Sequence, residues 1–240
     1  MNTGTVAGHT TTAVWSALGA VLDPELDEPV TRLGFVHEVE VGECEAGGAV
    51  VRVVLRLPTY FCAPNFAYLM VADAADAVRA VPGVTHAEIV LCDHFAAAEI
   101  NAGVAEEHGF AAAFPGEATG EPAVLRRTFQ RKAYLASLDR VCGMLLARGW
   151  RPDELTTRTL ADVPDSPERR RLVRRRAALG LPCDPDSVVL VDEDGVPIPS
   201  GQVTTTLRFA RAVRVSIEGN AGLCTGLLRT RYGGVQEDGS

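Results

Sequence analysis

The sequence contains a single lysine, Lys132, and all of its other basic side chains except histidine are arginines. Because Arg131 precedes this lysine, a phosphate-binding P-loop of the G-x-x-x-x-G-K-[ST] type is excluded. Schiff-base chemistry would have to depend on Lys132 alone. The net charge of −8 also disfavours a protein dedicated to nucleic acids, since such proteins usually carry a basic excess.

The sequence also lacks paired cysteines and long apolar runs. None of its six cysteines forms a C-x-x-C pair, which argues against a self-contained zinc finger. The longest of the later uncharged runs, 57–72, contains two prolines and is too short to span a membrane. The first twelve residues contain no arginine or lysine, so we expect no targeting segment. These features predict a soluble cytoplasmic protein with reduced thiols and no membrane partner.

Aromatic residues make up only 6% of the chain, although 47% of it is hydrophobic, so Ala, Val and Leu must supply most of a globular core. Charge is unevenly distributed. Residues 1–110 carry four basic and 15 acidic side chains, whereas residues 111–240 carry 19 basic and 16 acidic ones. The change coincides with a Gly/Pro-rich stretch, 114–122. We therefore predict one domain over 1–110, a linker over 111–122 and a second module over 123–240.

Hydrophobic spacing in the first domain changes between the helical period and the alternating period of a strand. The predicted elements, in chain order, are a helix at 12–22, strands at 35–41 and 50–57, a helix at 64–81 and a strand at 84–91. Gly47-Gly48 separates the first two strands, which favours an antiparallel hairpin. This order predicts an α+β fold: a small mixed sheet with helices on one face.

The second module is predicted to be mainly α-helical. Apolar residues recur at helical spacing in 121–149, and Ser166-Pro167 is a favourable start for a helix that ends at Gly180. Short apolar runs at 188–191 and 196–198 suggest a hairpin, whereas the pattern in 202–215 fits either a helix or extended structure.

Cys62 is the first candidate for chemistry, because it lies between a predicted strand and a helix that begins near Pro64. The unpaired N–H groups at a helix N-terminus stabilise a thiolate, the form that binds iron and attacks electrophiles. An ordinary half-buried packing cysteine is the alternative. Asp23 and Glu25 belong to an acidic loop that could orient a metal ligand or accept a proton, or could be a solvated turn.

Three further residues are candidate metal ligands. Cys92 and His94 follow the third predicted strand and could approach the Cys62 loop, although a buried cysteine beside a surface histidine is the more common arrangement. Cys224 lies in a stretch of small residues that permits close backbone approach, and it could complete a site with Cys62 or belong to the core. A thiol enzyme would need a general base, and His94 is the histidine placed for that role.

Residues 13–93 resemble the PaaD/SufT-like family of iron–sulfur cluster assembly proteins. The motifs of the resemblance are Asp23-Pro24-Glu25-Leu26, Leu33-Gly34-Phe35, Thr59-x-x-Cys62 and Val81-Pro82-Gly83-Val84. The resemblance implies a small α+β domain whose loop cysteine takes part in delivering iron or a cluster. It also implies functional roles for Asp23, Glu25 and Thr59 beside Cys62.

The second module contains a run of arginines that could bind an acidic partner. The run consists of Arg169, Arg170, Arg171, Arg174, Arg175 and Arg176. A solvated helix face whose aliphatic stems pack downward is the alternative. The run lacks interleaved aromatic residues, so nucleic acid is not the expected partner.

Together these features predict an accessory protein for metallocentre maturation, and not an enzyme. Cys62 would hold iron or an iron–sulfur cluster transiently, and the second module would recognise a client metalloenzyme. By family association the client could be an oxygenase, and the protein could act as a homodimer. The alternative is a chaperone-like adaptor that stabilises a client by contact alone, which the bulky Tyr60-Phe61 pair before Cys62 favours.

Overall fold

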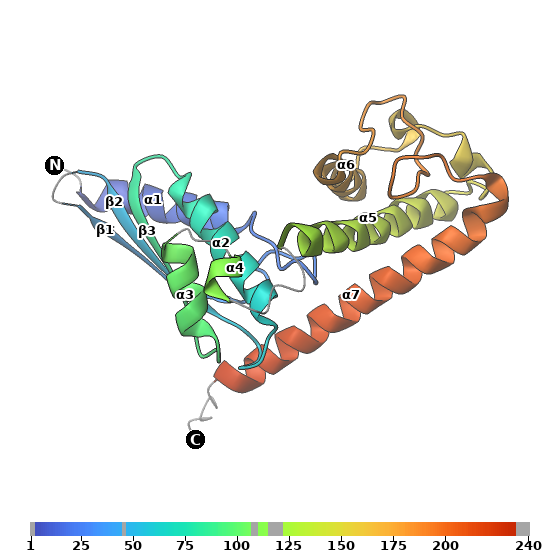
Figure 1. Cartoon of the computed structure of the whole chain (residues 1–240). Helices are drawn as coiled ribbons and strands as arrows, with labels where there is room; N and C mark the ends of the chain where they lie inside the picture. Colours follow the sequence, from blue (N-terminus) through green and yellow to red (C-terminus); the bar gives the residue numbers. More distant parts are fainter. Residues whose placement is uncertain (1–2, 45–46, 107–109, 115–121, 234–240) are drawn as a thin grey trace, which may run out of the picture. The chain divides into compact units, whose positions relative to one another are not determined.

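The computed structural model describes residues 3–44, 47–106, 110–114 and 122–233 (Figure 1). Its strands are β1 (Val36–Glu43), β2 (Ala49–Arg56) and β3 (Val84–Cys92). Its α-helices are α1 (Thr3–Leu18), α2 (Pro64–Arg79), α3 (Ala97–Ala105), α4 (Phe110–Ala113), α5 (Pro122–Ala147), α6 (Pro167–Leu179) and α7 (Val203–Tyr232). Single 3₁₀ turns lie at Glu154–Thr156, Leu160–Asp162 and Ser200–Gln202.

Contacts between Cα atoms divide the chain into two compact units. The first unit contains residues 1–122 together with 220–240, and the second contains residues 123–219. Helix α7 therefore begins in the second unit and ends in the first. Most of the predicted linker, residues 115–121, lies outside the described residues.

The first unit has the predicted α+β fold, a three-stranded mixed sheet in the order β1-β2-β3. Strands β1 and β2 form the predicted antiparallel hairpin, and Val53 pairs with Val39 across it. Strands β2 and β3 are parallel, as they must be when α2 provides the crossover between them, and Val53 pairs with Ile89 on this side.

Alternate residues of β2 place the core of the first unit on one face of the sheet. Val51, Val53 and Leu55 are buried in the core of the first unit. Arg52 points to the opposite face, where it lies 3.5 Å from Glu40 on β1 and 3.3 Å from Glu88 on β3. Helix α1 packs against β1 and α2, and α2 packs against β3 and α3.

Two predicted boundaries differ from the structure. Helix α1 spans Thr3–Leu18, whereas apolar spacing placed the helix at 12–22. Residues 3–11 are rich in Thr and Gly, so they give little apolar signal although they are helical. At the other end the helix closes at Gly19, and Val21, which lies in the turn that follows, is buried.

The second unit is mainly helical, as predicted. Ser166 caps α6 by accepting a hydrogen bond from the backbone N–H of Arg169, and Gly180 ends this helix in the left-handed conformation. The undecided stretch 202–215 lies almost entirely in α7. The predicted hairpin at 188–198 is reduced to one isolated bridge between Val191 and Pro197. Among the described helices, none has the length and apolar character needed to cross a membrane.

Candidate functional site

Cys62 lies in the loop between β2 and α2, immediately before the residue that caps α2. Pro64 is the first residue of α2, where its missing N–H costs nothing, and Ala63 is the N-cap. The Cys62 Sγ is 3.2 Å from the Thr59 Oγ1, and the same hydroxyl accepts a hydrogen bond from the backbone N–H of Phe61. Thr59 therefore holds the half-buried thiol inside a closed local turn.

His94 fixes this loop from the other side without facing the thiol. Its Nδ1 accepts a hydrogen bond from the Ala96 N–H, so its Nε2 carries the proton and donates to the Cys62 carbonyl oxygen at 2.7 Å. Burial lowers the pKa of His94, and the positive charge of Arg231 acts in the same direction. His94 is therefore a neutral imidazole that positions the backbone of Cys62.

The thiol of Cys92 also points to the backbone. Its Sγ donates to the carbonyl oxygen of Leu55 at 3.4 Å, across the β2–β3 pair. Of the four cysteine and histidine residues predicted to bind metal, the structure thus places Cys92 and His94 in hydrogen bonds with backbone groups.

The acidic loop after α1 is built around the carboxylate of Asp23, which is only 7% exposed. Its Oδ1 accepts hydrogen bonds from the backbone N–H groups of Glu25 and Leu26, at 2.9 and 2.8 Å. Burial raises the pKa of Asp23 to about 6, the two hydrogen bonds oppose this, and the charge of Glu25 adds to it. The loop therefore holds a buried carboxyl group that titrates near neutral pH.

Cys224, on the last part of α7, completes this cluster. Burial raises the pKa of its thiol to about 11, and the negative charges of Asp23, Cys62 and Glu25 raise it further in that order. Cys62 and Cys224 both pack against the core of the first unit, and these interactions place Cys224 in the neighbourhood of the Cys62 loop and the acidic loop. Residues from three distant parts of the sequence thus form one group of two thiols and two carboxylates in the first unit, which we call the thiol cluster.

Arg231 attaches the end of α7 to the two loops around Cys62. Its guanidinium donates to the Leu57 carbonyl at 3.2 Å and to the Asp93 carbonyl at 2.7 Å. Asp93 has a positive φ of 54° and Asp27, in the acidic loop, one of 55°, a conformation that aspartate tolerates better than most residues. Sequence reasoning missed Arg231, because nothing in its local pattern indicates a contact with loops so distant along the chain.

Within the described residues, no three His, Cys, Asp or Glu side chains are arranged to hold a metal ion.

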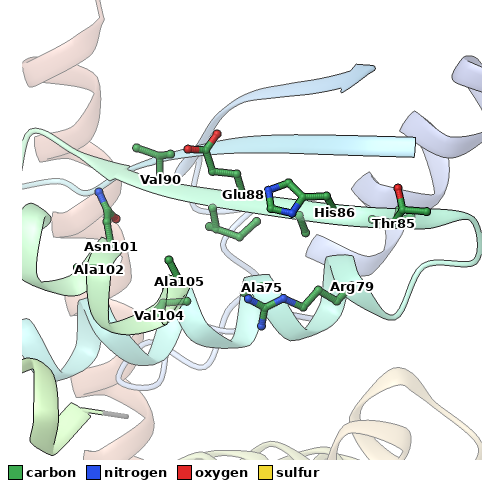
Figure 2. A pocket seen from close by; sticks show the side chains of 13 residues that line it. Ala75, Arg79, Thr85, His86, Glu88, Val90, Asn101, Ala102, Val104 and Ala105 are labelled. Atoms are coloured by element: carbon green, nitrogen blue, oxygen red, sulfur yellow. The ribbon is translucent and has the colours of Figure 1, made fainter. Parts of the chain in front are cut away.

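A separate cavity of about 780 Å³ lies along β3. Its polar lining includes Arg79, His86, Glu88 and Asn101, and Figure 2 shows the first of these on α2 and the next two on β3. Because neither thiol of the cluster lines it, we do not assign the candidate chemistry to this cavity.

The structure separates one arginine of the second unit from the rest of the run. Arg176 is fully buried, and its guanidinium donates to the carbonyl oxygens of Pro182, Val188 and Val189. It therefore supports the core and is not exposed to a partner. Arg170 and Arg174 are exposed, and both line a cleft with the half-buried Arg169.

Comparison with models of protein families gives one finding for this chain. Residues 11–89 match the family described as iron-sulfur cluster assembly protein. The match runs from α1 into β3 and includes the acidic loop, Thr59 and Cys62, whereas Cys92, His94 and Cys224 lie beyond it. No curated protein and no solved structure gave a match.

Proposed function

We propose, from the premise that the N-terminal region of this chain is a domain of the iron–sulfur cluster assembly protein family, that Cys62 transiently holds iron or an iron–sulfur cluster as cargo. In this proposal the protein is an accessory factor that passes the cargo to a client metalloenzyme, and family association makes an oxygenase the candidate client. The thiol cluster is the observation that supports the proposal.

The electrostatics of the thiol cluster favour a cation. Burial is the largest reason why the thiol pKa of Cys224 is raised to about 11, and Asp23, Cys62 and Glu25 also disfavour a negative charge there. A cation placed near these groups would add an attraction that opposes their mutual repulsion, and it would favour the thiolate, which is the form that ligates iron. If Cys62 and Cys224 both ligated the metal, its other ligands would come from a donor or an acceptor, as transient carriage requires.

The supporting residues give Cys62 a defined position. Thr59 contacts its sulfur, and His94 holds its carbonyl oxygen, so the loop is fixed before any cargo arrives. Asp23 organises the neighbouring loop through its two backbone hydrogen bonds. In the second unit, the exposed arginines Arg170 and Arg174, together with Arg169, are proposed to bind an acidic surface of the client.

The test is anoxic reconstitution of the full chain with ferrous iron and sulfide, followed by measurement of bound iron and of the visible absorption. We expect Cys62→Ala to weaken iron binding at least about tenfold, since even the loss of an outer-sphere partner of a ligand costs that much. Cys183→Ala is the matched control, because this half-buried thiol lies in the second unit and donates to the Leu181 carbonyl. Equal iron in wild type and Cys62→Ala would overturn the proposal.

The second candidate function is an adaptor that stabilises a client by contact alone. The exposed aromatic side chain of Phe61, next to Cys62, favours it, because it suits contact with a protein whether or not metal is bound. This candidate predicts that a client enzyme keeps its activity when the chain carries Cys62→Ser, whereas the carrier proposal predicts that the activity is lost.

A further inference from the structure

Three aromatic side chains beside Cys62 are exposed to solvent. Tyr60 is 46% exposed, Phe61 is 77% exposed and Phe95 is 47% exposed. Their ring centroids lie 5.0 Å (Tyr60 to Phe61), 6.4 Å (Tyr60 to Phe95) and 6.0 Å (Phe61 to Phe95) apart, so the rings contact one another and form one surface. We call these three residues the aromatic platform. The chain has only two Trp, four Tyr and eight Phe, so the aromatic platform gathers a large share of the aromatic residues of the chain at one exposed place.

The platform is rigidly connected to the thiol. The backbone N–H of Phe95 donates to the carbonyl oxygen of Tyr60 at 3.1 Å, which joins the loop after β3 to the loop after β2. The ring of His94 lies 4.9 Å from that of Phe95, and its Nε2 donates to the carbonyl oxygen of Cys62. The loops that carry the three rings and Cys62 are therefore joined to one another through their backbones, so a molecule bound on the platform lies near Cys62.

Exposed rings in contact with one another are costly in water and typical of protein interfaces. Apolar surface left in water lacks the stabilisation that burial against a partner would supply. Aromatic residues are enriched at interfaces, where they supply most of the binding free energy at few positions. A platform of this kind at the loop of a candidate carrier cysteine therefore indicates a polypeptide partner at that position.

The ligand requirement of the cargo identifies the occupant. Iron–sulfur clusters are held by cysteine thiolates, commonly four. The thiol cluster supplies Cys62 and Cys224, so the polypeptide that receives the cargo must bring its own cysteines to the same place. We propose that the aromatic platform binds an apolar segment of the acceptor polypeptide and presents the acceptor cysteine within that segment to Cys62. The transfer role rests on the proposed function, whereas the docking itself needs no metal.

The docking is measured by thiol–disulfide exchange with the metal-free full chain. The probe is a short peptide whose single cysteine is a mixed disulfide with thionitrobenzoate. The Cys62 thiolate attacks the peptide sulfur, a new disulfide joins Cys62 to the peptide, and the coloured thionitrobenzoate anion leaves with the electron pair of the broken bond. One peptide has leucine and phenylalanine on both sides of its cysteine, and the other has serine. The rate of the Cys62→Ser chain is subtracted, because it reports the other five cysteines.

We expect wild type to react about tenfold faster with the apolar peptide than with the serine peptide, since a single good aromatic contact is worth more than 1 kcal/mol. Phe61→Ser and Phe95→Ser should reduce this preference to about twofold or less while leaving the rate with the serine peptide unchanged, which shows that the loop remains folded. Phe209→Ser is the matched control, because Phe209 is 61% exposed in the second unit, and it should keep the full preference.

The outcomes separate the two proposals. Equal rates for the two peptides in wild type, or an unchanged preference in both platform variants, would overturn the docking proposal even if Cys62→Ala loses its iron. A strong preference in wild type together with equal iron in Cys62→Ala would overturn the carrier function and leave the docking in place. Phe61→Ser is expected to bind as much iron as wild type.

Discussion

The individual groups of the thiol cluster are governed by burial more than by their neighbours. Asp23 and Cys224 both have raised pKa values, and in each case burial is the largest cause. Charged neighbours then act in the same direction, because Glu25 disfavours the Asp23 carboxylate and both carboxylates disfavour the Cys224 thiolate. No positive charge is among the causes of the raised pKa values of Asp23 and Cys224, so a cation bound near them would favour the ionised forms of these two groups.

Asp23 gives a prediction for stability against pH. Its folded pKa of about 6 lies above the ordinary value of 3.8, so the folded state binds more protons than the unfolded state between these values. The contribution of Asp23 to stability is therefore complete below pH 3.8 and is lost as the pH rises through 6. The loss amounts to at most about 3 kcal/mol.

Urea unfolding at pH 4 and pH 7 measures this contribution. Asp23→Asn keeps an oxygen that can accept the hydrogen bonds from Glu25 and Leu26 but cannot ionise, so we expect it to be more stable relative to wild type at pH 7 than at pH 4. Asp76→Asn, at a carboxylate with an 81% exposed side chain, is the control and should leave the pH dependence unchanged. An identical pH dependence in wild type and Asp23→Asn would contradict the raised pKa.

At the scale of elements, the end of α7 acts as a structural part of the first unit. Ala221, Cys224 and Leu228 pack against the core that α1, α2 and the sheet enclose, and Arg231 binds the loops after β2 and β3. Leu228 also lies against Gly34, where a Cβ atom would come within 3.2 Å of its Cδ2. This helix therefore restrains the loops that hold Cys62.

Gly34→Ala is expected to destabilise the first unit by about 1–2 kcal/mol. Gly34 has a positive φ of 78°, which costs a residue with a Cβ about this amount, and the new methyl group also crowds Leu228. Gly8→Ala is a matched control in α1, where a Cβ meets nothing within 4 Å, and it should stabilise by up to about 1 kcal/mol. Urea unfolding of both variants measures these changes in the free energy of unfolding. An unchanged free energy of unfolding in Gly34→Ala would argue against the contact with α7.

At the scale of the whole molecule, the chain leaves the first unit at Pro122 and returns to it at Asn220. The second unit is thus an insertion between two segments that complete the same core. Its own core is separate and includes Tyr134, whose hydroxyl donates to the Val191 carbonyl at 2.7 Å. The two cores should therefore respond separately to the loss of residues after 219.

A chain that ends at Gly219 should lose stability in the first unit only. Removing the three apolar side chains of α7 that pack on its core is expected to cost about 3 kcal/mol or more. The two tryptophans report the units separately, because Trp15 lies in the first and Trp150 in the second. Fluorescence-detected unfolding of Trp150→Phe and Trp15→Phe chains, each with and without residues 220–240, measures the effect. An unshifted Trp15 transition would contradict the role of α7.

The sequence was most informative where local pattern and fold agree. Alternation in β1 and β2 predicted the hairpin, and the Ser166 cap with Gly180 predicted α6, because these signals depend on neighbours along the chain. It was least informative where burial depends on distant partners. The run of arginines looked uniform, yet Arg176 alone among the six is fully buried, since three carbonyl groups from the following loop surround it.

The sequence by itself determined the match of residues 11–89 to the iron-sulfur cluster assembly protein family, the mixed sheet of the first unit and the place of Cys62 before the first turn of a helix. Each of these follows from short motifs and local spacing. Only the tertiary structure decided that Cys224 and Arg231 lie at the same loops, and that the rings of Tyr60, Phe61 and Phe95 form one surface beside the thiol. The physical reason is that contacts between segments far apart in the chain arise from packing and leave no periodic signal in either segment.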